Sequence, residues 1–168
     1  MGILSGLSII PQGDHDHWCW ASVTQGICQF LEKRPYSLEA VVVKVFDDTS
    51  CAEQPTPALC DIAWSLNRAL TKVGHLTASL NRTMTFQELQ NQIDTLEKPV
   101  AIEITFPSAF GDLPHACLIK GCLVVEGNQE VVLLDPSKAV NGESQLSFSD
   151  LTSGATLGAP WTDSYITT

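Results

Sequence analysis

The chain has 168 residues, of which 44% are hydrophobic and 17% are charged, so we predict one folded domain over residues 1–168 and no extensive disorder. Its formal net charge of −10 repels phosphate backbones and argues against nucleic acid as a partner. The same acidity favours a basic substrate only weakly, because acidic charge also keeps a protein in solution.

Helical patterns begin near the N-terminus. Residues 19–32 carry apolar side chains at helical spacing, which predicts an amphipathic helix. Ser37 then precedes Leu-Glu-Ala-Val and is a plausible N-cap for a short second helix. The polar segment 47–57 contains two prolines and a cysteine, so we expect a loop there.

Two further helices are expected between residues 57 and 93. Pro57 suits a first helical turn, and apolar residues continue with helical period from Leu59 to Val73. Gly74 would end that helix. The sequence Thr-Phe-Gln-Glu at 85–88 is a capping-box pattern and predicts a helix as far as about Ile93.

The second half of the chain has strand patterns. Residues 100–106 alternate between apolar and polar side chains, and residues 115–125 form a mostly apolar run. A tight turn over 126–129 leads to a third strand over 130–135, and residues 161–167 alternate again. Helices followed by an antiparallel sheet predict an α+β fold, with a site at the seam between the two halves.

The sequence is compatible with more than one cellular location. No run of 18 or more apolar residues occurs, so we expect no membrane-spanning helix and no membrane partner. The first residues lack the pattern of a signal peptide, which leaves a cytoplasmic protein or a secreted one whose export signal was removed. Nothing in the sequence specifies the oligomeric state.

None of the six cysteines forms a C-x-x-C pair, which argues against a zinc ribbon or a thioredoxin-like site. Cys51 and Cys60 flank a proline-rich segment and are the most plausible disulfide pair. Cys28, Cys117 and Cys122 lie in apolar runs, so we expect them to be core residues.

Cys19 occupies the start of the first expected helix, within Trp-Cys-Trp-Ala-Ser. A thiol at this position faces unpaired backbone N–H groups and the positive end of the helix dipole, which lowers a cysteine pKa. Because the thiolate is the nucleophile, this placement would activate Cys19. Position alone favours one more buried cysteine, and the residues described next reverse that preference.

His115 begins the second expected strand, and an imidazole beside a thiolate can form an ion pair and later protonate a leaving amine. His15 and His17 are too close to Cys19 in sequence to meet its sulfur easily across a cleft. His75 follows the glycine that ends a helix, so we expect it at the surface.

Asp135 ends the third expected strand and could accept a hydrogen bond from Nδ1 of His115, although an aspartate before proline also often begins a turn. The hairpin between the two strands would bring His115 and Asp135 to the same end. Gln12 lies upstream of Cys19, and its amide could join the Cys19 N–H in holding an oxyanion. A glutamine in a loop carries little information by itself.

The order Gln, Cys-Trp-Ala, His-Ala and Asp-Pro resembles papain-like cysteine peptidases. Trp-Cys-Trp-Ala is similar to the compact bacterial branch typified by the AvrRpt2-type effector peptidases. The resemblance covers nearly the whole chain, with residues 60–74 similar to the middle helix of that branch and residues 160–167 similar to its closing strand. It implies a papain-like fold, in which a helical N-terminal half packs on a C-terminal antiparallel sheet with the active site between them.

The resemblance also implies the roles of four residues. Cys19 would be the nucleophile, His115 the base, Asp135 the orienting residue and Gln12 the oxyanion-hole donor, acting on a protein or peptide substrate without a cofactor or metal. Gln12 departs from the pattern, because it lies seven residues before Cys19 and the family usually has six. The role of Gln12 therefore stays open.

The loop Asp14-His15-Asp16-His17 beside Cys19 could bind a metal ion. Because the sequence shows no matching distant ligand, a polar loop at the rim of the cleft is the favoured interpretation.

Three other functions remain compatible with the sequence. The same triad could serve a deamidase or transglutaminase, or a peptidase that removes leader peptides, because the fold does not choose among these reactions. An inactive binding module is a further alternative, although the intact cysteine, histidine and aspartate argue against it.

Overall fold

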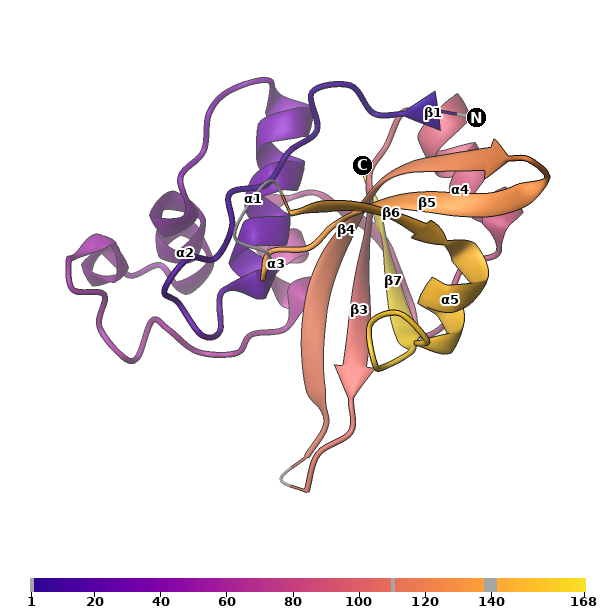
Figure 1. Cartoon of the computed structure of the whole chain (residues 1–168). Helices are drawn as coiled ribbons and strands as arrows, with labels where there is room; N and C mark the ends of the chain where they lie inside the picture. Colours follow the sequence, from indigo (N-terminus) through magenta and orange to yellow (C-terminus); the bar gives the residue numbers. More distant parts are fainter. Residues whose placement is uncertain (1, 110, 138–141) are drawn as a thin grey trace.

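The computed structural model describes residues 2–109, 111–137 and 142–168. Helices α1, α2 and α3 lie together on one side, and an antiparallel sheet forms the other side (Figure 1). The helical side is built from the first half of the chain and most of the sheet from the second half. This confirms the expected α+β architecture.

Helix α1 (Cys19–Glu32) is the central helix of the helical side and contacts β4 of the sheet as well as α2 and α3. Every residue from Trp20 to Cys28 is buried, so α1 is enclosed on all sides over this part. Helix α2 (Leu38–Phe46) begins after Ser37, whose side chain accepts a hydrogen bond from the Ala40 N–H. Both helices confirm the sequence prediction.

The helix expected over 59–73 is half wrong. Helix α3 spans only Leu66–Val73, with Ser65 as its N-cap and Gly74 at its end. Leu59 is 63% exposed and Ile62 is 37% exposed, so the apolar residues before position 65 do not form a buried helical face. The resemblance of residues 60–74 to a middle helix therefore holds only for their second half.

Three interactions account for the irregular segment before α3. Cys60 forms a disulfide with Cys51, which lies in a short 3₁₀ helix (Thr49–Ala52) inside the expected loop. The backbone carbonyls of Cys60 and Ile62 accept hydrogen bonds from two tryptophan indoles of the Trp-Cys-Trp motif. Carbonyls used in this way are not available for a helical ladder.

The sheet has the strand order β2-β7-β3-β4-β5-β6, and β1 pairs with β4 outside this path. Its strands are β1 (Gly2–Ile3), β2 (Leu76–Leu80), β3 (Val100–Phe106), β4 (Leu113–Val125), β5 (Asn128–Leu134), β6 (Glu143–Ser147) and β7 (Trp161–Thr167). The sequence predicted β3, β4, β5 and β7 but missed β1, β2 and β6. The missed strands have no more than five residues each, which is too short for a clear alternation.

Short helices cover the rest of the sheet. Helix α4 (Phe86–Gln90) begins with the expected capping box between Thr85 and Glu88, and a π-helical turn (Asn91–Thr95) continues it. Helix α5 (Phe148–Ser153) follows β6 and was not predicted. Phe148 packs edge-on against Phe86 and Trp161, so α4, α5 and β7 share one aromatic cluster.

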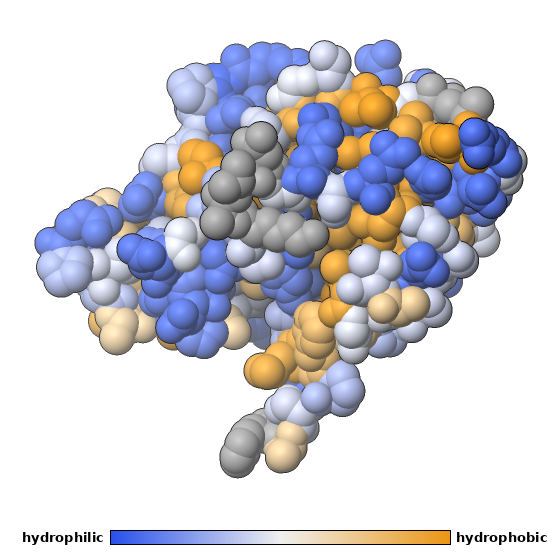
Figure 2. All heavy atoms as spheres, viewed as in Figure 1, coloured by the Kyte–Doolittle hydropathy of each residue, from blue (hydrophilic) through white to orange (hydrophobic). Residues whose placement is uncertain are grey.

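The β3–β4 hairpin projects away from the body of the molecule (Figure 1). Apolar side chains follow this projection in the space-filling view (Figure 2), and Leu113 on β4 is 60% exposed. Within the described residues, no helix combines the length and the apolar character needed to cross a membrane.

Candidate active site

Cys19 is the first residue of α1, and the two tryptophans beside it fix its position. The Trp18 indole donates to the Cys60 carbonyl at 2.8 Å, and the Trp20 indole donates to the Ile62 carbonyl at 3.1 Å. Both rings are fully or almost fully buried. The sequence left the role of these tryptophans open, and the structure shows that they clamp the start of α1 to the segment before α3.

The N-terminus of α1 offers free hydrogen-bond donors to the thiol. Trp18 occupies the N-cap position, no side chain caps the helix, and no acidic residue lies in its first turn. The positive end of the helix dipole therefore has no competing anion from these residues near Cys19. Of the four free cysteines, only Cys19 is partly exposed; Cys28, Cys117 and Cys122 are buried, as the sequence predicted.

His115 and Asp135 form the hydrogen bond that the sequence led us to expect. Nε2 of His115 lies 2.9 Å from Oδ1 of Asp135, and the two side chains are 21% and 7% exposed. The expectation that Nδ1 makes this bond was wrong. The bond to Asp135 places a proton on Nε2 and leaves Nδ1 as the nitrogen available to the thiol of Cys19.

Electrostatics favour a charged His115 beside an ionised Asp135. Burial alone would lower the pKa of His115, but the bonds to Asp135, Cys117 and Cys19 outweigh it and raise that pKa well above its usual value. Burial would likewise raise the pKa of Asp135, whereas the bonds from His115 and Ser137 lower it to about 2. Both the N–H and the hydroxyl of Ser137 donate to Oδ1 of Asp135.

Strand register explains why these residues meet. Strands β4 and β5 are antiparallel, with Leu118 opposite Leu134, so Asp135 follows at the position opposite Cys117. His115 lies two residues from Cys117 on the same strand and therefore on the same face. A ring nitrogen of His115, the sulfur of Cys117 and a carboxylate oxygen of Asp135 all lie within 4.8 Å of one another. The sequence assigned Cys117 to the core, and its thiol also borders the imidazole.

Gln12 lies near Asp135, but its amide is turned toward its own loop. The Gln12 backbone N–H donates to the carbonyl of Pro136 at 3.2 Å, which attaches this loop to the residue after Asp135. Its side-chain Nε2 donates to the carbonyl of His15 at 2.7 Å, and its Oε1 is buried without a hydrogen-bond partner. One N–H of the amide is therefore occupied and the second remains for another acceptor.

The loop of alternating aspartate and histidine packs against Asp61, a distant carboxylate that sequence reasoning missed. Asp61 accepts hydrogen bonds from the backbone N–H groups of Asp16 and His17. The His15 ring stacks on Trp18 with a centroid separation of 3.6 Å, and its Nδ1 lies 3.9 Å from Asp61. Asp61 thus holds the loop beside the nucleophile, although nothing in the sequence marked it.

A cleft of about 320 Å³ lies between the segment before α3 and the sheet. Ala63, Trp64 and Ser65 line it from the segment before α3, and Glu103 and Pro114 line it from β3 and β4. Pro114 directly precedes His115 on β4, and the side chains of consecutive strand residues point to opposite faces, so the cleft is lined by the neighbour of the imidazole and not by the ring itself.

His75 lies apart from this site, and it is partly buried rather than freely exposed at the surface as the sequence predicted. Its side chain is only 15% exposed, and Nε2 bonds to Oε1 of Glu32 at 2.9 Å. Glu32 is the last residue of α1, whereas Cys19 is the first. His75 therefore takes no part in the group around Cys19.

Comparison with known proteins identifies the fold. No protein-family model and no curated protein matches the sequence. Among solved structures, the digestive procathepsin L 3 of the larval midgut of Tenebrio molitor has a TM-score of 0.57 at 14% identity, covering 95% of this chain and 66% of that chain. A structure from work on the mite allergens Blo t 1 and Der p 1 has a TM-score of 0.60 at 13% identity, with coverages of 96% and 67%.

The digestive procathepsin L2 proteinase of the same Tenebrio midgut has a TM-score of 0.54 at 14% identity, covering 96% of this chain and 64% of that chain. The chain thus spans about two thirds of the length of these proteins. At such low identity, the likeness establishes the arrangement of helices and strands rather than an activity. The helical half packed on an antiparallel sheet is the papain-like fold.

Proposed function

We propose that residues 1–168 form a papain-like cysteine peptidase domain that hydrolyses peptide bonds in a protein or peptide substrate. The observation that carries this proposal is the hydrogen bond between His115 and Asp135, on a ring that also interacts with the Cys19 thiol at the start of α1. In this proposal Cys19 is the nucleophile, His115 the base and Asp135 the residue that orients the base. The papain-like fold supports this assignment, because it is also the fold implied by the motifs around the same residues.

The proposed reaction has two steps. The Cys19 thiolate attacks the carbonyl carbon of the peptide, a C–S bond forms, and the C–N bond breaks as His115 gives its Nδ1 proton to the leaving amine. Water then attacks the thioester while His115 takes one of its protons, and the C–S bond breaks to release the acid. Asp135 holds the ring through Nε2 in both steps and stabilises its charged form.

Gln12 is proposed to hold the oxyanion together with the Cys19 N–H. The bond from Nε2 to the His15 carbonyl holds the Gln12 amide and leaves its second N–H to donate elsewhere. This arrangement requires no cofactor. The extra residue between Gln12 and Cys19 is taken up in the loop that Asp61 holds.

We also propose kinship with the compact bacterial effector-type branch, on the Trp-Cys-Trp-Ala motif alone. Deamidation, amine transfer and leader-peptide removal would use the same residues, and an inactive binding module would use none of them. Since no contact in the structure favours one of these over peptide hydrolysis, they become outcomes of the experiment below.

The test combines thiol labelling with product analysis. Wild-type protein, Cys19→Ala, His115→Ala and the control Cys122→Ser are treated with iodoacetamide across acid to alkaline pH, and modified peptides are mapped. We expect Cys19 to label fastest at low pH, and His115→Ala to abolish this advantage while Cys122→Ser retains it.

In parallel, a library of unstructured peptides is incubated with each variant and read by mass spectrometry. New termini that disappear in Cys19→Ala support hydrolysis, whereas the small mass increase of deamidation or a new isopeptide bond would replace it with the corresponding transfer reaction. If Cys19 labels no faster than the buried thiols, the proposal is wrong and the binding-module alternative takes its place.

A further inference from the structure

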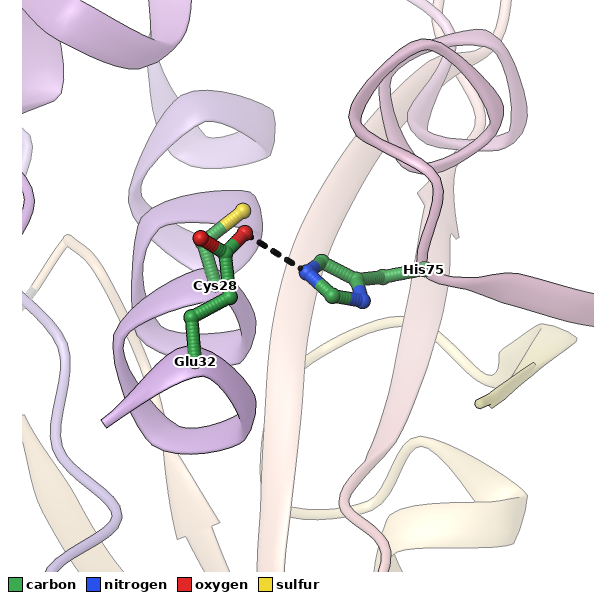
Figure 3. A group of neighbouring side chains, drawn as sticks. All are labelled: Cys28, Glu32 and His75. Carbon is green, nitrogen blue, oxygen red and sulfur yellow. Dashed lines mark hydrogen bonds and ion pairs between the residues drawn. The ribbon is translucent and has the colours of Figure 1, made fainter. Parts of the chain in front are cut away.

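A second group of reactive side chains lies at the other end of α1. Cys28 and Glu32 are four residues apart on this helix and therefore share one face, and His75 approaches them from the segment after α3. The sulfur of Cys28, a carboxylate oxygen of Glu32 and a ring nitrogen of His75 all lie within 4.8 Å of one another. Figure 3 shows the sulfur of Cys28 and the carboxylate of Glu32 side by side, both on the side of α1 that faces His75.

Each polar member of this group is oriented by a second partner. Nδ1 of His75 lies 3.3 Å from the Thr168 hydroxyl, which leaves Nε2 directed at Glu32. Oε2 of Glu32 accepts hydrogen bonds from the Tyr36 hydroxyl at 2.6 Å and from Arg34 at 2.8 Å, which leaves Oε1 directed at His75. Metal-ligating histidines and carboxylates typically have such outer partners on the atom that does not bind the metal.

The charge at this end of α1 also favours a cation. The C-terminal end of a helix carries a partial negative charge, and α1 has no basic side chain in its last turn, although Arg34 just beyond it pairs with Oε2 of Glu32. Hydrogen bonds from Tyr36, His75 and Arg34 outweigh the effect of burial and lower the pKa of Glu32 to about 2, so its carboxylate is ionised at neutral pH. A divalent ion would complement both the carboxylate and the helix end.

We propose that Cys28, Glu32 and His75 form a binding site for a divalent transition-metal ion of the zinc type. Thiolate, imidazole and carboxylate are all ligands that Zn²⁺ takes, and three protein ligands leave a fourth position for water. Glu32 and His75 are partly exposed, which gives the ion and its water access from solvent. The site is separate from the proposed peptidase reaction and does not depend on it.

Binding needs only a small rearrangement. In a tetrahedral site, bonds of about 2.0–2.2 Å would hold Oε1 and Nε2 roughly 3.3 Å apart, against 2.9 Å in their present hydrogen bond. The Cys28 thiol must also lose its proton to the solvent, because burial and the charge of Glu32 raise its pKa to about 12. The ion replaces that proton as the partner of the sulfur, so metal binding releases protons.

The bound ion would join two parts of the fold. Cys28 and Glu32 belong to the central helix, whereas His75 directly precedes β2 at one edge of the sheet. The site begins about 14 Å along α1 from Cys19 at Cys28 and reaches about 20 Å at Glu32, at a rise of about 1.5 Å per residue. A metal here would stabilise the packing of α1 against the sheet edge without entering the cleft.

The test uses Co²⁺ as the probe, because a cobalt–thiolate bond gives an intense near-ultraviolet band and tetrahedral Co²⁺ absorbs strongly in the visible. Chelator-treated Cys19→Ala protein, in which the exposed thiol is absent, is titrated with Co²⁺ and then with Zn²⁺. We expect one equivalent of Co²⁺ to bind with a thiolate band, Zn²⁺ to displace it, and Zn²⁺ to raise the thermal unfolding temperature.

In the Cys19→Ala protein, Cys28→Ser should abolish the thiolate band. His75→Ala and Glu32→Gln should weaken Co²⁺ binding by more than about 100-fold, which exceeds the loss expected from residues that only support a metal ligand. Cys122→Ser and Cys117→Ser serve as matched thiol controls and should leave the titration unchanged. His75→Ala provides the answer if the buried Cys28→Ser variant fails to fold, since its ring lies near the surface.

Two outcomes would overturn the proposal. If Co²⁺ produces no thiolate band, Glu32 and His75 form an ion pair beside a core cysteine and nothing more. If the band survives His75→Ala but disappears in Cys117→Ser, the metal occupies the group around His115 instead.

Discussion

Replacing Asp135 with asparagine separates the charge of this residue from its hydrogen bond. The amide oxygen of Asp135→Asn can still accept from Nε2 of His115, but the negative charge 2.9 Å from that nitrogen is lost. A hydrogen bond to a charged group contributes about 1.5–3 kcal/mol and a neutral one about 0.5–1.5 kcal/mol. The difference of about 1–1.5 kcal/mol corresponds to a fall of about one unit in the pKa of His115.

The sign of the effect follows from the ion pair. Asp135 stabilises the protonated imidazole, so its loss lets His115 release the proton at lower pH, and the alkaline limb of kcat/KM should move to lower pH by about one unit. Stability changes as well. The pKa of Asp135 is lowered to about 2 from 3.8, so the pair stabilises the fold above that ordinary value and loses this contribution as pH falls toward 2.

The assay is the pH profile of kcat/KM together with the pH profile of Cys19 alkylation, which reports the same ion pair without substrate binding. Asp47→Asn is the matched control, because it removes one negative charge from a side chain that is 76% exposed and paired with Lys72. The reasoning is refuted if Asp135→Asn leaves the alkaline limb of kcat/KM in place, or if Asp47→Asn shifts that limb equally.

Three further predictions address other parts of the molecule. Replacing Cys51 and Cys60 together by serine should lower the free energy of unfolding by about 2.6 kcal/mol for a loop of sequence separation 9, measured by urea denaturation; an unchanged midpoint would contradict it. Gly26→Ala should destabilise by about 1–3 kcal/mol although alanine favours helices, because the added Cβ would lie 2.7 Å from Ile9; a rise in the unfolding temperature would refute the close contact. Gln12→Ala should lower kcat about 100-fold and leave Cys19 alkylation unchanged, and equal losses in both would show that Gln12 only supports the loop.

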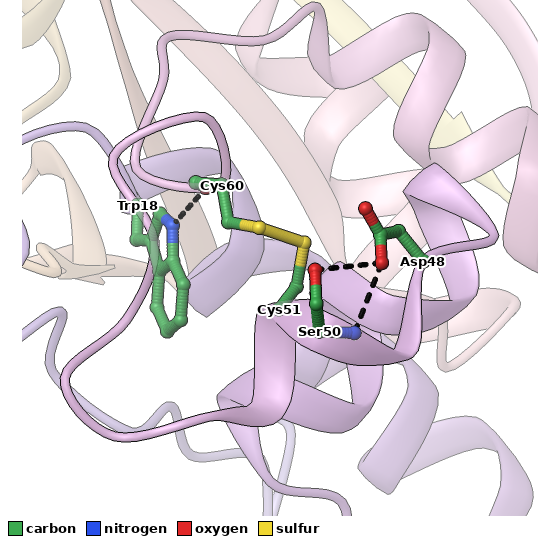
Figure 4. Close-up of a disulfide and its surroundings, with 5 residues drawn as sticks. All are labelled: Trp18, Asp48, Ser50, Cys51 and Cys60. Carbon is green, nitrogen blue, oxygen red and sulfur yellow. Dashed lines mark hydrogen bonds between the residues drawn. A yellow bond between two sulfur atoms is a disulfide. The ribbon is translucent and has the colours of Figure 1, made fainter.

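Sequence patterns predicted the elements whose periodicity is set by one buried face. The regular spacing in α1, the cap at Ser37 and the capping box at Thr85 all correspond to observed elements. The failure came at residues 59–65, where apolar spacing suggested a helix. There the disulfide and the carbonyl acceptors for two tryptophan indoles determine the backbone, as Figure 4 shows for Trp18 and the Cys51–Cys60 pair. The two indole contacts join residues 42 positions apart, so local periodicity cannot reveal them.

In the candidate site, the order of the strands could be predicted from the sequence, whereas the pairing register between them could not. The sequence placed His115 and Asp135 at the same end of one hairpin, but residues at the same end need not share a face. Counting from the turn, where Val125 pairs with Asn128, an uninterrupted ladder would put Asp135 opposite Leu118, which points to the other face from His115. The pairing shifts by one residue between Ile119 and Gly121, and this bulge puts Asp135 opposite Cys117 instead.

The bulge is stabilised by a strand that sequence reasoning missed. Strand β1 pairs with β4 at Gly121, and the Leu4 N–H donates to the Lys120 carbonyl at the irregular position. A Cβ at Gly121 would lie 2.9 Å from the Ile3 side chain, so only glycine admits β1 this closely. The N-terminal strand β1 thereby helps to fix the register that turns Asp135 toward His115.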